Sequence, residues 1–359
     1  MWAPQNEGPP PGPVSLAARL TTSAASAACA CLALWAPFAA APGAAAADWP
    51  LTGALRVHDP CIVEDGATWW VFGTGPGIRS KSSSDGLNWT DRGPLLKSEP
   101  AWWRTYAPSM GKLDVWAPDV HRFNGRFWCY YSVSEFATNH SAIGLLSCES
   151  LATGAWRDDG FVVSSVDATS ARATSDPERR LDPSGRPWFN TIDPSLATDA
   201  SGAPWLVFGS WFDGIHVVRL DPATMKPAGP STAVAYKPNG IEAPNILYRD
   251  GFYYLFVSVD KCCQGVKSTY KIAYGRSRVI TGPYVDRAGA PMLESGGSIL
   301  AAGGTRWKGP GGQTVYQGAR GWIVAYHSYD AERNGAPMLR ISDLLWDAGG
   351  WPTLAEPRS

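Results

Sequence analysis

The sequence predicts an all-β protein, a five-bladed β-propeller, and three observations support this prediction. After residue 50 the chain consists of short aromatic and β-branched runs separated by Gly, Asn and Asp turns, which is typical of many short strands. One pattern occurs five times: a polar residue beside Pro or Gly, an apolar residue, a Gly-containing turn and an aromatic strand. Further strand-like runs, such as 143–146 and 215–218, follow most copies, which gives about four strands per blade.

Each copy contains a predicted β-hairpin. Asn-Gly and Asp-Gly between strand patterns are strong hairpin signals because these residues adopt positive φ at low cost. The hairpins are expected over residues 59–72, 118–131, 193–208, 242–256 and 312–326. If the innermost strand of each blade starts at one rim of the central channel, five leading polar residues should converge on the axis. These residues are Asp59, Asp119, Asp193, Glu242 and Gln313.

The first part of the chain has the pattern of an export signal rather than of a folded domain. Residues 24–41 are almost entirely apolar and lead into the small residues 45–47, so cleavage is expected after residue 47. Pro37 interrupts the apolar run and Pro42 ends it, and the run is also shorter than the ~20 residues needed to span a membrane. We therefore expect a signal peptide or disorder over residues 1–47 and one secreted propeller domain, not bound to a membrane, over residues 48–359.

Composition favours a neutral partner. The 31 Lys and Arg residues nearly balance the 32 Asp and Glu residues, and the net charge is -1. No overall field therefore attracts nucleic acid or an anionic membrane. The 18 Trp and 13 Tyr residues can fill a β core or stack on sugar rings. The sequence contains neither a glycine-rich phosphate-binding motif nor a nucleophile elbow.

Five cysteines follow the expected signal peptide: Cys61, Cys129, Cys148, Cys262 and Cys263. Because their number is odd, at least one of them has no partner within the mature chain. Cys129 and Cys148 lie on successive predicted strands, where they either form a disulfide or remain two buried thiols. No Cys-x-x-Cys pair is present, so no structural zinc site is expected.

The converging carboxylates have a chemical interpretation. Hydrolysis of a glycosidic bond needs one ionised carboxylate to activate water and one protonated carboxyl to donate to the leaving oxygen. A third carboxylate nearby raises the pKa of the acid by like-charge repulsion. The alternative is turn chemistry, in which Asp caps a turn and Pro presets φ. Three acids at matching repeat positions favour a functional site.

Four short segments resemble the signature segments of glycoside hydrolase family 43: His58-Asp59-Pro60, Trp116-Ala117-Pro118-Asp119, Ile192-Asp193-Pro194 and Glu242-Ala243-Pro244. The resemblance covers about residues 55–355. Within the family, residues 242–277, which include Cys262-Cys263-Gln264-Gly265, resemble the arabinanases. The resemblance implies a secreted inverting hydrolase that cleaves internal α-1,5-L-arabinofuranosidic bonds in arabinan.

The resemblance also implies the catalytic roles. Asp59 corresponds to the general base, Glu242 to the general acid, and Asp193 to the residue that tunes and orients the acid. An inverting pair stands about 6.5–9.5 Å apart to admit water, a separation that opposite sides of a propeller channel could supply.

Five further residues are candidates for substrate binding. Trp116 and Phe136 match aromatic positions that line the cleft in members of the family, and the alternative for both is ordinary blade core. Asp119 is either a substrate contact or a structural cap. Ser210 and Tyr270 are weaker candidates of the same kind.

The sequence departs from many arabinanases at the position of a bound metal. Those proteins carry Gly-His-Asn, whose His helps to hold an ion, often calcium; here residues 309–313 read Gly-Pro-Gly-Gly-Gln. We expect no cofactor for the chemistry and a structural calcium or other ion at the axis, near the Gln313 carbonyl. His327 is expected to be structural rather than a ligand.

Two other functions fit the same scaffold. The first is an α-L-arabinofuranosidase or a β-xylosidase, which loops around the cleft would distinguish from an arabinanase. The second is a non-catalytic sugar-binding propeller, which has no need of a protonated glutamate. The expected partners are arabinan and arabino-oligosaccharides, and the expected state is a monomer.

Overall fold

The computed structural model describes residues 48–165 and 189–354. Contacts divide the chain into residues 1–43 and 44–359, and all the described residues belong to the second unit. The predicted signal peptide and the Asp- and Arg-rich segment 167–182 lie outside the described residues. None of the helices in the described ranges has the length and apolar character needed to cross a membrane.

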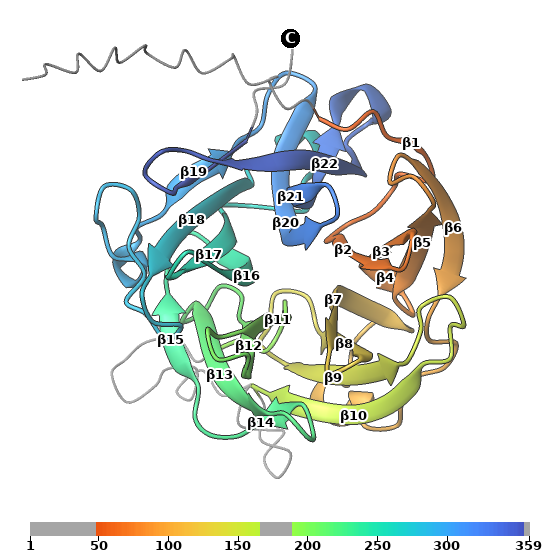
Figure 1. Cartoon of the computed structure of the whole chain (residues 1–359). Helices are drawn as coiled ribbons and strands as arrows, with labels where there is room; N and C mark the ends of the chain where they lie inside the picture. The colour runs from red at the N-terminus through yellow and green to blue at the C-terminus, as the bar shows by residue number, and fades with distance from the viewer. Residues whose placement is uncertain (1–47, 166–188, 355–359) are drawn as a thin grey trace, which may run out of the picture. The chain divides into compact units, whose positions relative to one another are not determined.

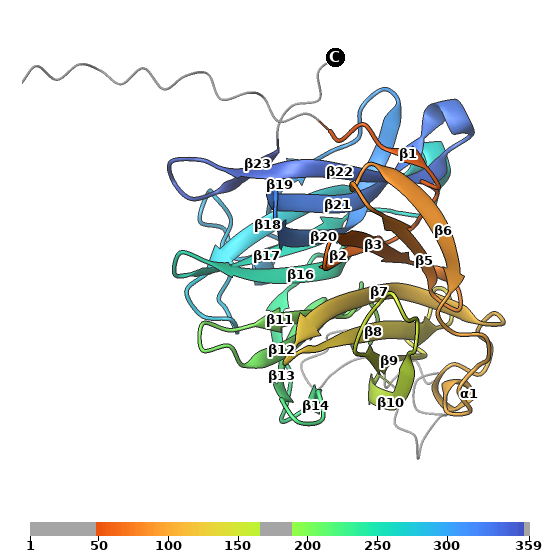
Figure 2. The same ribbon diagram turned by 45° about the vertical axis from the view of Figure 1, so that its right-hand side comes forward.

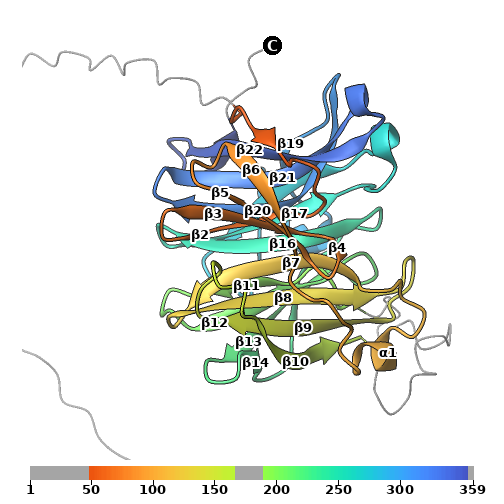
Figure 3. The same cartoon turned by 90° about the vertical axis from the view of Figure 1, so that its right-hand side faces the viewer.

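The described residues form five β-sheets arranged as blades around a common centre (Figure 1). This arrangement confirms the predicted all-β class and the five-bladed propeller. In the views turned by 45° and 90°, the strands of a blade lie beside one another and run across the picture (Figures 2 and 3). In each blade the innermost strand is one that the repeat pattern predicted.

The first two blades have five strands each. The first has the order β1-β6-β5-β3-β2, with β1 (Thr52–Gly53), β2 (Cys61–Asp65), β3 (Thr68–Gly73), β5 (Arg79–Ser83) and β6 (Asn88–Pro94). The second has the order β10-β9-β8-β7-β4, with β4 (Gly75–Pro76), β7 (Asp114–Phe123), β8 (Arg126–Ser134), β9 (Ser141–Cys148) and β10 (Arg157–Ser164). The short helix α1 (Trp103–Tyr106) precedes β7.

The other three blades complete the ring. The third contains β11 (Ser195–Thr198), β12 (Pro204–Phe208), β13 (Ile215–Asp221), β14 (Lys226–Pro227) and β15 (Thr232–Ala235). The fourth contains β16 (Ile241–Arg249), β17 (Phe252–Val259), β18 (Lys271–Ser277) and β19 (Ser298–Ala301). The fifth contains β20 (Trp307–Gly318), β21 (Gly321–Asp330), β22 (Ala336–Trp346) and β23 (Pro352–Leu354). Within residues 48–165 and 189–354, three 3-10 turns lie between strands: η2 (Gly265–Lys267), η3 (Met292–Glu294) and η4 (Ala331–Arg333).

Residues 49–57 join the fifth blade to the first. The Trp49 N–H donates to the Ile341 carbonyl (2.9 Å), and the Leu339 N–H donates to the Leu55 carbonyl (2.8 Å). The same segment then continues into the inner end of the first blade at Asp59. The start of the propeller therefore pairs with β22 of the last blade and ties the two blades together.

The core lies between adjacent blades. One cluster joins Val63 and Phe72 of the first blade to Val120 and Phe127 of the second. Four other clusters join the second blade to the third, the third to the fourth, the fourth to the fifth, and the fifth to the first. Buried aromatic side chains such as Tyr131 supply much of this contact area, since each can bury about 150–250 Å².

The two alternatives for Cys129 and Cys148 are resolved in favour of buried thiols. Both residues and Cys61 are free and buried. The disulfide of the described residues instead joins the sequence neighbours Cys262 and Cys263.

Candidate active site

A positive backbone φ marks the inner end of every blade. The φ angle is 48° at Asp59, 41° at Ala117, 55° at Asp193, 49° at Ala243 and 57° at Gly312. Four of these residues precede Pro, and the fifth precedes Gln313. L-residues seldom adopt this conformation, and they persist in it only where the surrounding structure holds them. The five residues therefore occupy one equivalent position of the repeat.

This equivalence corrects the predicted alignment of the leading polar residues. Asp59 and Asp193 share the positive-φ position, but Glu242 comes one residue earlier and Asp119 two residues later. Gln313 occupies the place of the prolines. The structural counterpart of Glu242 in the second blade is Trp116, because each precedes a bulge that shifts the strand register by one residue. The acids therefore do not come from one repeat position.

The positive-φ residues are held by hydrogen bonds between neighbouring blades. In four cases their backbone N–H donates to a side chain near the end of the second strand of the preceding blade: Ala117 to Thr74 Oγ1 (2.8 Å), Asp193 to Ser132 Oγ (3.0 Å), Gly312 to Ser258 Oγ (2.9 Å) and Asp59 to His327 Nδ1 (3.1 Å). In the remaining blade Gly209 holds that place and has no side chain. There the Ala243 N–H donates to the Asp193 carboxylate (3.0 Å).

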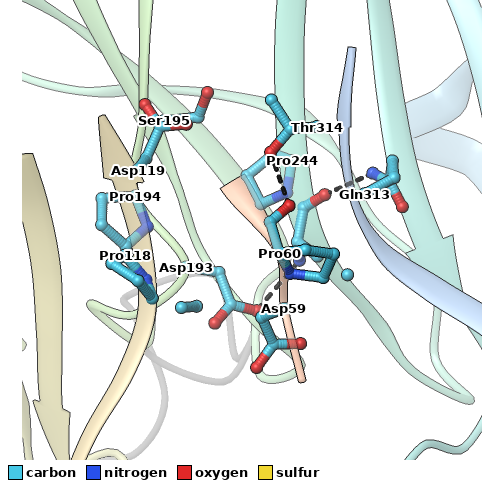
Figure 4. A pocket seen from close by; sticks show the side chains of 13 residues that line it. Asp59, Pro60, Pro118, Asp119, Asp193, Pro194, Ser195, Pro244, Gln313 and Thr314 are labelled. Carbon is cyan, nitrogen blue, oxygen red and sulfur yellow. Dashed lines mark hydrogen bonds between the residues drawn. The ribbon is translucent and has the colours of Figure 1, made fainter. Parts of the chain in front are cut away.

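A pocket lies at the centre of the blades (Figure 4). The positive-φ residues line it together with the residues that follow them: Asp59, Pro60, Ala117, Pro118, Asp119, Asp193, Pro194, Ser195, Ala243, Pro244, Gly312, Gln313 and Thr314. Figure 4 shows the carboxylates of Asp59 and Asp193 at the same end of this pocket. The structure thus brings acids from the first and third blades to one place.

Asp59 is held in its ionised form. Its Oδ2 lies 2.7 Å from His58 Nδ1 and accepts a hydrogen bond from Thr74 Oγ1 (2.6 Å). Burial alone would raise the pKa of Asp59, but the charge and hydrogen bond of His58, with smaller contributions from His327 and Thr74, hold it well below its usual range. Burial lowers the pKa of His58, yet Asp59 raises it by more, so the net shift is upward. A carboxylate in this environment can accept a proton from water.

Glu242 has the opposite environment. Its side chain is buried, Tyr270 donates to Oε1 (2.7 Å), and Ser210 donates to Oε2 (2.8 Å). Burial raises the pKa of Glu242; the hydrogen bonds of Tyr270 and Ser210 oppose this shift, and the negative charge of Asp59 adds to it. The net pKa is raised, as a general acid requires.

The pKa of Asp193 is raised as well. Burial, then the negative charges of Glu242 and Asp59, raise the pKa of Asp193 well above its usual range. Because Asp193 and Glu242 interact strongly, the retained proton belongs to the pair rather than to either residue. The bond from the Ala243 N–H to Asp193 also fixes the peptide that follows Glu242. Asp193 can therefore both tune and position the acid.

The candidates for substrate binding fall into two groups. Ser210 and Tyr270 are buried, and the hydroxyl group of each donates a hydrogen bond to the Glu242 carboxyl. Trp116 is half-buried and precedes Ala117 of the pocket, while Phe136 is 78% exposed. Sugar contacts of Trp116 and Phe136 stay predictions.

Sequence reasoning missed the partners of Asp59. His58, Thr74 and Tyr329 form a chain of contacts with the Asp59 carboxylate, and the Tyr329 hydroxyl lies 2.8 Å from His58 Nε2. His58 belongs to the segment His58-Asp59-Pro60, whereas no sequence signal connects it with Tyr329.

Both carboxylate oxygens of Asp119 have polar partners within the protein. The Leu196 N–H of the third blade donates to Oδ2 (2.8 Å), and His121 Nε2 lies 3.2 Å from Oδ1.

Replacement of Asp119 by Ala should lower the free energy of unfolding by about 1–3 kcal/mol, because the buried Leu196 N–H loses its acceptor. Denaturant unfolding measures this loss. Asp119→Asn is the control, since an amide oxygen can still accept from Leu196; an equal loss in both variants would contradict the explanation.

The residues at the axis do not fit a calcium ion bound directly by the protein. Calcium takes six to eight oxygen ligands. The Gln313 carbonyl already accepts from Ser258 Oγ (2.7 Å), and the Gln313 amide donates to the Ala243 carbonyl (2.7 Å). His58, Asp59 and His327 offer three ligand atoms within 4.8 Å of one another, but two of the three are nitrogens. An ion held through water near Gln313 stays a prediction.

Comparison with known proteins agrees with this geometry. The family model described as glycosyl hydrolases family 43 matches residues 52–352. The extracellular endo-α-(1→5)-L-arabinanase 1 of Bacillus subtilis is 45% identical over 88% of this chain and 93% of its own length. The extracellular exo-α-(1→5)-L-arabinofuranosidase ArbA of Cellvibrio japonicus is 36% identical over 84% of this chain and 87% of its own length.

Solved structures give the same result. The family 43 endo-arabinanase of Bacillus licheniformis superposes with a TM-score of 0.77 and is 48% identical, covering 85% of this chain and 99% of its own. An α-L-arabinanase of Cellvibrio cellulosa, solved with arabinohexaose, gives a TM-score of 0.75 at 36% identity, covering 84% of this chain and 95% of its own.

Proposed function

The chain belongs to glycosyl hydrolase family 43, and from this premise we propose that it cleaves internal α-1,5-L-arabinofuranosidic bonds of arabinan outside the cell. The main support for the proposal is that the environments of two neighbouring acids shift their pKa values in opposite directions. The pKa of Asp59 is lowered by its neighbours, and that of Glu242 is raised by burial. Hydrolysis with inversion needs one carboxylate in each of these states.

The proposed reaction follows from these two states. Asp59 accepts a proton from a water molecule as that water attacks the anomeric carbon. Glu242 donates its proton to the glycosidic oxygen as the bond to the leaving chain breaks. Asp193 holds the Ala243 N–H and repels the ionised form of Glu242, so that the acid stays protonated until it reacts. The products are two shorter chains, one of which carries an inverted reducing end.

Two relatives support the substrate and the location. Proteins at 45% and 36% identity are both named extracellular, the first as an endo-α-(1→5)-L-arabinanase and the second as an exo-α-(1→5)-L-arabinofuranosidase. Export through residues 1–47 and a monomeric state are parts of the same proposal. The remaining choice is between endo and exo action.

The distribution of early products tests the endo assignment. On linear debranched arabinan, we expect a mixture of short oligomers from the first minutes, because an endo enzyme cuts at internal bonds. Chromatography of timed samples gives this distribution. Aryl arabinosides and xylo-oligosaccharides serve as comparison substrates and should react far more slowly. Arabinose as the sole early product would contradict endo action, and faster turnover of a comparison substrate would favour an arabinofuranosidase or a xylosidase.

A further inference from the structure

The disulfide between Cys262 and Cys263 lies in the loop between β17 and β18. Cys262 is half-buried, and Cys263 is exposed. This loop packs on the loop after β21, since a Cβ at Gly335 would lie 2.9 Å from the Gly265 Cα. Figure 3 shows these teal and blue loops beside each other on one face of the propeller. The disulfide is therefore held in place by contacts between the fourth and fifth blades.

Contacts lead from this disulfide to Asp59. The Cys263 N–H donates to the Tyr329 hydroxyl (2.8 Å), and this hydroxyl lies 2.8 Å from His58 Nε2. His58 Nδ1 in turn contacts Asp59 (2.7 Å). The Cys263 sulfur itself lies 3.9 Å from His58 Nε2. The exposed disulfide is thus separated from the proposed base by one imidazole ring.

The same loop ends at the proposed acid. Its last residue, Tyr270, donates to Glu242 (2.7 Å). The base of the loop is closed by the Thr269 N–H, which donates to the Lys261 carbonyl (3.0 Å). The disulfide therefore belongs to a short closed loop that contacts the proposed acid, Glu242, and the His58 ring beside the proposed base.

Solvent reaches the disulfide and the base together. The side chain of Asp59 is 18% exposed, that of His58 is 21% exposed, and Cys263 beside them is exposed. Val266, in the same loop, is 45% exposed. A sugar chain with one ring at Asp59 can therefore place a neighbouring ring over Cys263. A disulfide has no N–H or O–H donor, and its polarisable sulfurs match the apolar C–H face of a furanose ring.

We propose that the Cys262–Cys263 disulfide is a binding surface for a furanose ring next to the ring that is cleaved. The proposal rests on the proposed arabinanase function and adds a residue pair that recognises the substrate. Its occupant is a ring of the arabinan chain, bound through its apolar face. Because the surface is a disulfide, reduction should weaken the binding of longer substrates.

The experiment compares the wild-type chain with the double variant Cys262→Ser, Cys263→Ser on arabinotriose and arabinohexaose. We expect KM for arabinohexaose to rise about fivefold, which corresponds to about 1 kcal/mol, with kcat changed less than twofold. KM for arabinotriose should change much less, because a short chain need not reach this surface. Treatment of the wild-type protein with tris(2-carboxyethyl)phosphine should have the same effect, and the double variant should not respond to it.

The outcomes separate this inference from the proposed function. Absence of arabino-oligosaccharide hydrolysis by the wild-type protein would refute the proposed function. Normal wild-type hydrolysis with an unchanged KM in the double variant would refute the disulfide surface alone. A fall in kcat on both substrates, together with a shifted pH profile, would also overturn it, because the disulfide would then act by positioning Tyr329 and His58.

Discussion

Replacement of Glu242 by Ala is expected to lower kcat on arabinan by about 10³-fold, within the range that general acid catalysis contributes. The leaving oxygen of a sugar is a poor leaving group unless it receives a proton as the bond breaks. In the variant no carboxyl remains beside Tyr270 and Ser210 to supply that proton. Initial rates on arabinan measure the loss. A kcat within tenfold of wild type would contradict the assignment of Glu242 as the acid.

The pH dependence of activity provides a control in which the Glu242 carboxyl is kept. Glu242 must be protonated to act, so activity falls as the pH rises through its raised pKa. The Tyr270 hydroxyl lowers that pKa because it donates to the ionised form. Tyr270→Phe should therefore move the basic limb of the profile to higher pH while Glu242 remains in place. A basic limb that moves to lower pH would show that another group sets it.

Replacement of Asp59 by Asn is expected to lower kcat by about 10³-fold as well, because an amide cannot take a proton from the attacking water. The change keeps the shape of the side chain and leaves an oxygen that can accept from Thr74. Thermal unfolding should confirm that the variant stays folded, and initial rates should show the loss. Near-normal turnover would exclude Asp59 as the base.

The acidic limb of the wild-type profile follows from the same environment. The pKa of Asp59 is held well below its usual range by His58, so Asp59 stays ionised as the pH falls through the mildly acidic range. Activity that depends on this base should therefore persist in mild acid. His58→Ala removes the main opposing charge and should move the acidic limb to higher pH, since burial would then raise the pKa of Asp59.

The five-fold repeat could be predicted from the sequence because each blade carries its own hairpin signal. The alignment of the repeats was wrong at Asp119, Glu242 and Gln313, since polar character was used to align them. The feature that all five blades share is a positive φ, which in four of them falls on the residue before Pro. Aligning Ala117-Pro118 and Ala243-Pro244 with the two Asp-Pro pairs would have found it. Asp59 and Asp193 still line the central pocket, and Glu242, which does not line it, lies close enough to interact electrostatically with both.

Contacts between distant parts of the chain could not be predicted from the sequence. His58 and Tyr329 lie 271 residues apart, and only ring closure brings them together. The pairing of the cysteines was also open. In β8 and β9, Cys129 lies opposite Leu146 and Cys148 opposite Phe127, so the two thiols are not cross-strand partners. That register depends on the turn between the strands, which the sequence pattern leaves uncertain by a residue or two.

The division of roles between Asp59 and Glu242 is tested most directly with arabino-oligosaccharides that carry a dinitrophenyl leaving group. Dinitrophenolate departs without a proton, so Glu242→Ala should hydrolyse this substrate within about tenfold of the wild-type rate. Asp59→Ala should remain about 10³-fold slower on both this substrate and arabinan, because water still needs its base. Equal losses on the two substrates for Glu242→Ala, or restored activity for Asp59→Ala, would contradict the assignment.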